Sequence, residues 1–278
     1  MTLISRDPRT LAQVHQEIRQ IFHGANLPSG NETEMLVYHG IHTAYRVTLE
    51  HCEEDELLPG SSKFGGHPDV LPEWKWPVDP EGKPLRFLYQ ILLSALEPER
   101  TSDCLPTQGM LSTFWDFNST SVHVAYTTDL NRLERRVPPE IGGTPTHTYS
   151  TRRMFLEQGY QLMDLFSDLP LENFSVAGQL YEACNVAVWG QMDQFAYTEL
   201  TLFGFVDSIP FGYRYAQPRR PANDPWLPIM MLRNVHLMDE DIAWDAGDNH
   251  SYKCEVLIGK EDLKHKRFSS AWFFLGVD

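Results

Sequence analysis

The stretch "SKFGGHPDVLPEWKWP" (Ser62–Pro77) guides the interpretation of the fold, because part of it occurs again half a chain later. The segment "FGFVDSIPFG" (203–212) repeats its Phe-Gly step and its aliphatic-Pro step. An apolar run follows each copy, "LRFLYQILL" after the first and "LPIMMLRNV" after the second. Self-similarity at a fixed offset indicates a repeated structural unit. The sequence therefore predicts an internal duplication, with a first half at about 43–127 and a second at about 185–278.

Short apolar runs separated by Pro and Gly predict a sheet-rich protein. They predict strands at 45–50, 85–96, 110–117, 121–126, 196–206, 227–235, 254–259 and 271–277. Apolar residues at helical spacing predict an N-terminal helix at 8–23 and further helices at 151–166 and 171–184. No alternation of strands and helices indicates a parallel sheet. We therefore expect one α+β domain over 1–278, with mainly antiparallel sheets, the N-terminal helix and a few peripheral helices.

The charge balance restricts the classes of partner. The chain has 278 residues with 23 basic and 38 acidic side chains, giving a net charge of -15. This balance argues against a nucleic-acid-binding protein, which needs clustered Lys and Arg, and favours encounter with a basic protein or peptide. No secretory signal or membrane-spanning run is apparent. We therefore predict a cytoplasmic protein with no membrane partner.

Motifs for known chemistry are absent from the sequence. It contains no G-x-S-x-G nucleophile elbow, P-loop or C-x-x-C pair. His39 and His42 lack a second pair of ligands at zinc spacing, although Cys52 follows. The acidic segment 238–249 lacks EF-hand spacing, and whether it binds a cation stays open. We therefore expect no cofactor or metal, and we assign no catalytic residue.

Four segments together resemble a known family. They are "SKFGGHPDVLPEWKWP", "GKPLRFLYQILLSAL", "AWDAGDNHSYKCEVLI" and "GKEDLKHKRFSSAWFFLG". Their order and spacing resemble the YwqG-like family, a bacterial domain of unknown function. The resemblance implies a duplicated, mainly antiparallel α+β fold and brings no established activity. The chain departs from the family pattern at Trp244-Asp245, where one glycine is missing, and at Arg233, near which the family has a glutamine; Gln90 matches the family in the first half.

Two hypotheses for function follow. The first is a non-catalytic binding protein that engages a protein or peptide through an acidic and aromatic surface, one form of which is an immunity protein that neutralises a toxin. The alternative is an enzyme or small-ligand-binding protein with a cleft between the two halves. The oligomeric state is not predicted. The candidate binding residues for the two hypotheses are Gly66, His67, Trp74, Trp76, Gln90, Arg233, Trp244 and Asp245.

Overall fold

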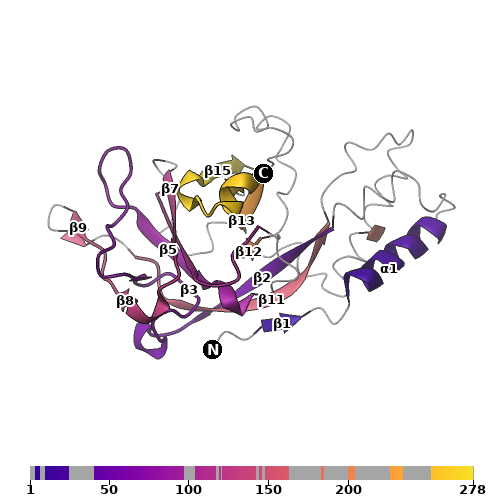
Figure 1. The fold of residues 1–278 in the computed structure, drawn as a ribbon, viewed down its shortest axis with the longest axis horizontal. Helices are drawn as coiled ribbons and strands as arrows, with labels where there is room; N and C mark the ends of the chain where they lie inside the picture. Colours follow the sequence, from indigo (N-terminus) through magenta and orange to yellow (C-terminus); the bar gives the residue numbers. More distant parts are fainter. Residues whose placement is uncertain are drawn as a thin grey trace.

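An 11-stranded, mostly antiparallel β-sheet dominates the computed structural model of the chain (Figure 1). The structure describes residues 4–6, 10–24, 41–96, 104–116, 119, 121–141, 144–145, 148–162, 183–184, 200–203, 226–233 and 252–277. The few helices lie at its periphery. The described part is therefore a sheet-rich α+β fold.

The main sheet is formed by strands from both ends of the chain. Its strands are β1 (Ile4–Arg6), β2 (Ile41–His51), β3 (Lys63–Phe64), β5 (Arg86–Leu92), β6 (Met110–Asp116), β7 (Ser121–Thr127), β11 (Arg152–Leu162), β12 (Leu200–Leu202), β13 (Trp226–Arg233), β14 (Tyr252–Gly259) and β15 (Trp272–Val277). Their order is β15-β14-β13-β12-β2-β11-β3-β5-β6-β7, and β1 pairs in parallel with β11.

The strand order is symmetric about the central β2–β11 pair. These two strands pair over their whole length, from Ile41 opposite Leu162 to His51 opposite Arg152. Outward from β2 the strands are β12, β13, β14 and β15, and outward from β11 they are β3, β5, β6 and β7. Each arm thus follows chain order. The later strand β12 pairs with the early strand β2, and the early strand β3 pairs with the later strand β11.

The helix predicted at 151–166 is wrong, because Arg152–Leu162 is strand β11. Met154, Leu156 and Tyr160 are buried on one face, whereas Arg153 and Glu157 are only partly buried. This two-residue alternation is typical of a strand that has one face in the core. The helix predicted at 171–184 lies largely outside the described residues.

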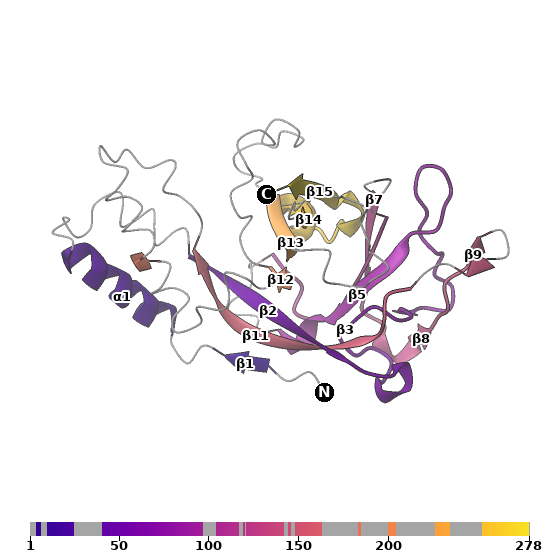
Figure 2. The same ribbon diagram turned by 180° about the vertical axis from the view of Figure 1, so that it is seen from behind.

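One core joins the two arms of the sheet. It includes Leu88 and Leu111 from β5 and β6, and Val256 and Phe273 from β14 and β15. The rings of Trp115 and Phe273 meet edge to face, 5.4 Å apart. Figures 1 and 2 show β7 beside β15, so the sheet curves until its two outer strands approach each other.

Short elements complete the described part. Helix α1 (Leu11–Gly24) buries Val14, Ile18 and Phe22, which lie on one helical face, and its first turn is capped by reciprocal hydrogen bonds between Thr10 and Gln13. Helix α4 (Lys260–Lys264) follows β14. The remaining elements are η1 (Glu54–Glu56), β4 (Asp69–Val70), η2 (Leu93–Ala95), η3 (Leu130–Arg132), β8 (Glu134–Arg135), β9 (Glu140–Ile141), β10 (Thr144–Pro145) and η6 (Phe268–Ser270). Strands β4 and β8 form a small sheet beside β3, and this sheet brings the segments of the candidate site together.

Candidate functional site

A tight Gly-Gly turn follows β3. Gly65 and Gly66 have φ values of +65° and +67°, in the left-handed region that favours glycine. Their N–H groups donate to the carbonyl oxygens of Leu88 and Tyr149, at 2.8 Å each. A Cβ atom on Gly65 would lie 2.3 Å from the carbonyl oxygen of Ser150, so no other residue fits there without movement of the backbone. The turn is therefore fixed between β5 and the segment that enters β11.

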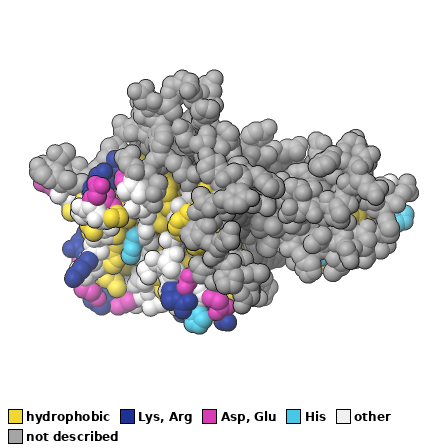
Figure 3. All heavy atoms as spheres, turned by 90° about the horizontal axis from the view of Figure 1, so that it is seen from above, with side chains coloured by type: hydrophobic (Ala, Val, Ile, Leu, Met, Phe, Trp, Pro, Cys, Tyr) yellow, Lys and Arg dark blue, Asp and Glu magenta, His cyan; other side chains and the backbone are white. Residues whose placement is uncertain are grey.

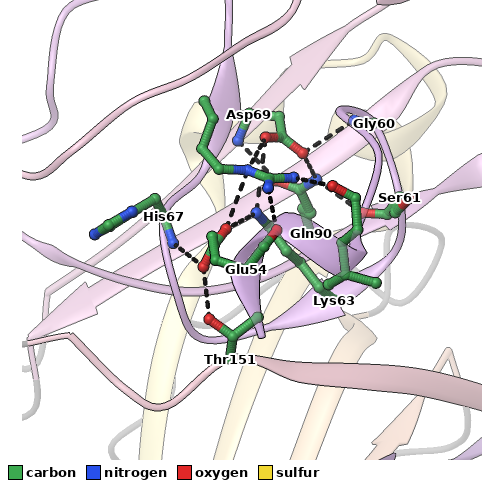
Figure 4. A network of polar contacts seen from close by, with 10 residues as sticks. Glu54, Gly60, Ser61, Lys63, His67, Asp69, Gln90 and Thr151 are labelled. Carbon is green, nitrogen blue, oxygen red and sulfur yellow. Dashed lines mark hydrogen bonds and ion pairs between the residues drawn. The ribbon is translucent and has the colours of Figure 1, made fainter. Parts of the chain in front are cut away.

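A buried lysine lies just before this turn. The side chain of Lys63 is fully buried, and its Nζ lies 2.6 Å from Oε1 of Glu54 and 3.7 Å from Oδ1 of Asp69. The Nε atom of Arg135 lies 3.0 Å from the same two carboxylate oxygens. Two cations and two carboxylates thus meet at one place, and Figure 4 shows the side chains of Lys63 and Glu54 directed toward each other. We call these four residues, together with Gln90 and Thr151, the polar network.

Asp69 and Gln90 close the inner side of the network. Oδ2 of Asp69 accepts hydrogen bonds from the backbone N–H of Gly60 at 2.9 Å and from Nε2 of Gln90 at 2.6 Å. Oε1 of Gln90 accepts from the backbone N–H of Asp69 at 2.9 Å, and its Nε2 also donates to the carbonyl oxygen of Ser61 at 2.8 Å. Gln90 therefore holds both ends of the segment 61–69 against β5.

Glu54 closes the outer side. Its Oε2 accepts from Oγ1 of Thr151 at 2.5 Å and from the backbone N–H of His67 at 3.2 Å. Arg135 also donates to the carbonyl oxygens of Glu54 and Leu57. A Cβ atom on Gly66 would lie 2.0 Å from Oε2 of Glu54, so the glycine leaves room for this carboxylate.

The electrostatics of the network favour the charged form of Glu54. Burial alone would raise the pKa of Glu54, but hydrogen bonds from Lys63 and Thr151 and the Lys63 charge outweigh it, and the pKa lies below its ordinary value. Burial lowers the pKa of Lys63, while the two carboxylates act in the opposite direction. Each charge has an opposite charge at contact distance. The arrangement suits a structural clamp better than a proton donor or acceptor that exchanges with substrate.

A second feature lies where the quoted stretch ends. Trp74 stacks on Phe114 with ring centroids 4.9 Å apart, and Trp76 meets the same ring edge to face at 5.6 Å. Nε1 of Trp76 donates to the carbonyl oxygen of Leu85 at 2.8 Å, and His123 lies beyond Phe114 at 6.5 Å. We call Trp74, Trp76, Phe114 and His123 the aromatic cluster. Both tryptophans and His123 are partly exposed, and the nearby Val78 is 54% exposed.

The sequence of the quoted stretch is part of a family match. The family described as "Domain of unknown function (DUF1963)" matches residues 62–276, from just before Lys63 to β15. The chain belongs to the DUF1963 family. A comparison with curated proteins found no match. Both the polar network and the aromatic cluster thus lie largely within the DUF1963 domain, and only Glu54 of the network precedes it.

The predicted site residues separate into three groups. Gly66, His67 and Gln90 meet at the polar network, although His67 takes part through its backbone while its side chain points away (Figure 4). Trp74 and Trp76 belong to the aromatic cluster. Arg233 ends β13, and four strands of the sheet order separate β13 from β5, which carries Gln90. Trp244 and Asp245 lie outside the described residues, as do His39 and the acidic segment 238–249.

Sequence reasoning missed two charged members of the network and the hydroxyl group of Thr151. Glu54, Arg135 and Thr151 are separated from Lys63 by up to 88 residues, and no local motif joins them. Lys63 and Asp69 do lie in the quoted stretch. The signal that could have identified them is a charged residue on each side of the Gly-Gly turn, each followed by an apolar residue. Among the residues that the structure describes, no group of three His, Cys, Asp or Glu side chains is placed to hold a metal ion. No helix in that part is long and apolar enough to cross a membrane.

Proposed function

We propose that this DUF1963 protein is a binding protein that engages a protein or peptide partner at the aromatic cluster and carries out no chemistry of its own. The single observation that supports this most is the position of Trp74 and Trp76 at the surface, packed on Phe114 and beside the exposed Val78. Aromatic side chains that are partly exposed and held rigid are typical anchors of protein interfaces.

The cluster is rigid for reasons that the contacts make clear. Phe114 is fully buried and belongs to a small core with Val70, Leu85 and Phe87. The indole N–H of Trp76 is fixed on Leu85, and the guanidinium of Arg136 donates to the carbonyl oxygen of Trp74 at 2.6 Å. A partner would therefore meet side chains that lose little conformational freedom on binding, which favours affinity.

The contacts of the polar network also support a protein without catalytic activity. Its carboxylates, ammonium, guanidinium and amide are engaged with one another and with the backbone. Groups in such a network are poor candidates for acid–base work, because they must first lose these contacts. The network instead fixes the segment 61–69 that leads into the aromatic cluster.

The negative net charge of the chain favours a basic partner. Within the described residues the acidic and basic side chains are equal in number, 18 of each, and Figure 3 shows both kinds intermixed on one face. The surplus of 15 negative charges therefore belongs to the rest of the chain. We propose that this surplus speeds encounter with a basic protein, and that the aromatic cluster supplies apolar contact. A basic toxin neutralised by this chain would be one such partner.

Site-specific photo-crosslinking in the native host tests the proposal. A photoreactive amino acid replaces Val78 beside the cluster, and in a control protein it replaces Leu58, which is 77% exposed and follows η1 at the polar network. We expect a defined crosslinked protein partner from position 78 and none from position 58. Equal crosslinking from both positions, or none from position 78 in a folded protein, would contradict the proposal.

We also infer that the symmetric strand order comes from duplication of a half-domain. Phe64 ends β3 and Phe203 directly follows β12, so the repeated Phe-Gly step lies at equivalent places in the two arms. Strand β3 pairs with β11 rather than with β2, and β12 pairs with β2 rather than with β11. Such an exchange of strands between two similar units is typical of an intertwined dimer whose subunits have been fused into one chain. An experimental structure tests this: a rotation of about 180° should superpose β3, β5, β6 and β7 on β12, β13, β14 and β15, and failure to superpose them would contradict duplication.

A further inference from the structure

A cationic surface lies on α4 and the turn that follows it, beside Tyr126 of β7. The side chains of Lys260 and Lys266 are exposed, and those of Lys264, His265 and Arg267 are 60%, 53% and 53% exposed. We call these four Lys and Arg residues, with His265 among them, the cationic surface. Lys260 and Lys264 are four residues apart on the helix and therefore share one face.

This surface is held firmly on the core. Leu263 and Phe268 are buried and anchor the segment just before Lys264 and just after Arg267. Arg267 donates to the carboxylate of Asp262 at 2.8 Å, and its backbone N–H donates to the carbonyl oxygen of Asp262 at 2.8 Å. The cations are thus presented from a fixed backbone, which reduces the entropy lost when a ligand binds.

Local carboxylates neutralise only part of the positive charge. Glu261 lies 3.7 Å from both Lys264 and His265, and Asp262 holds Arg267. Within the part of the chain that the structure describes, Lys260 and Lys266 have no carboxylate partner. Lys266 instead has a left-handed backbone, with φ +56°, and its Nζ lies 5.7 Å from the centre of the Tyr126 ring. Two cations, one beside an aromatic ring, are therefore available to an anionic ligand.

The size of that ligand is limited by the charge of the whole chain. Screening reduces electrostatic interactions beyond about 8 Å at physiological salt, so a ligand that covers only the cationic surface feels mainly the local cations. A long polyanion such as nucleic acid would extend over a protein of net charge -15 and be repelled. A short run of carboxylates fits these limits.

We propose that the cationic surface binds an acidic peptide segment of a partner protein, as a second interaction site separate from the aromatic cluster. Carboxylates of the segment pair with Lys260 and Lys266, and an apolar or aromatic residue beside them contacts the ring of Tyr126. Such contacts are individually weak, so the interaction is fast and sensitive to salt.

The test uses a fluorescein-labelled hexaglutamate peptide and the full chain, with binding followed by fluorescence anisotropy at low and at physiological salt. The variant K260Q/K266Q removes the two free cations. The control K75Q/K83Q removes the same charge from exposed lysines elsewhere. Circular dichroism checks that both variants are folded. We expect roughly 3- to 10-fold weaker binding in K260Q/K266Q only, and weaker binding as salt rises.

Three results would overturn the proposal. They are equal affinity of K260Q/K266Q and wild type, an equal loss in K75Q/K83Q, and tighter binding of single-stranded oligonucleotide or of anionic lipid vesicles than of the peptide at the same salt. The first two would show that the cationic surface is not the binding site. The third would assign it to a different class of ligand. None of them bears on the crosslinking at Val78, so the two proposals fail separately.

Discussion

Substitution of Glu54 by Gln is the sharpest test of the polar network as a structural clamp. The change keeps the shape of the side chain and removes its charge. Lys63 is fully buried and would lose the partner that lies 2.6 Å from its Nζ. Breaking one side of a fully buried pair costs about 3–5 kcal/mol.

Two features of the structure reduce that figure. The side chain of Glu54 is 25% exposed, and Asp69 remains 3.7 Å from the Lys63 ammonium and 3.0 Å from Nε of Arg135. We therefore expect E54Q to lower the free energy of unfolding by about 2 kcal/mol. Urea unfolding followed by circular dichroism measures this loss as a lower midpoint at unchanged slope.

Asp55 supplies the matched control. It lies beside Glu54 in η1 and is exposed. D55N removes the same charge from the same loop and should change the free energy of unfolding by less than about 0.5 kcal/mol. If E54Q and D55N were equally stable, the network would contribute nothing to the fold, and the reasoning from its contacts would be refuted.

Three further predictions follow from the same contacts. Because the pKa of Glu54 is lowered in the folded protein, its charge stabilises the fold above the ordinary pKa of 4.5, and this stabilisation is lost as pH falls through the lower folded-state pKa. In urea titrations at a series of pH values, the difference in free energy of unfolding between wild type and E54Q should therefore decrease below pH 4.5. G65A should cost more than about 3 kcal/mol because its Cβ meets the carbonyl oxygen of Ser150, whereas G82A, with φ +83° and open space around it, should cost only about 1–2 kcal/mol; similar losses in thermal unfolding would contradict the steric argument. W76F removes the hydrogen bond to Leu85 and should cost about 1 kcal/mol while far-ultraviolet circular dichroism is unchanged; an unaltered stability would show that this hydrogen bond does not hold the cluster.

The strands could be predicted from the sequence where a short apolar run ends at turn residues. The apolar runs at 110–117 and 121–126 correspond to β6 and β7, which are bounded by turn residues. Strand β11 was missed because its apolar residues also fit helical spacing, and only its pairing with β2 along eleven residue pairs selects the extended form. Where the local pattern fits both a helix and a strand, tertiary pairing therefore determines which of the two forms.

The candidate site shows a similar division. The quoted stretch pointed to Gly66 and His67 and the family resemblance to Gln90, and these three residues do lie close together. The groups that surround them came from η1, from β8 and from Thr151 just before β11, and only the folded topology brings these segments to β3. Local sequence identified the turn, and could not identify the partners that fill the space beside it.

One measurement tests the central claim most directly, because it separates the aromatic cluster from the polar network. The photoreactive amino acid is placed at position 78, and the yield of the crosslinked partner is compared in two backgrounds at a temperature where both are folded. E54Q alters the polar network, and W74A removes the ring that stacks on Phe114. We expect E54Q to keep the yield of wild type and W74A to lower it. Loss of the crosslink in folded E54Q, with W74A unchanged, would contradict binding at the aromatic cluster and place it at the polar network.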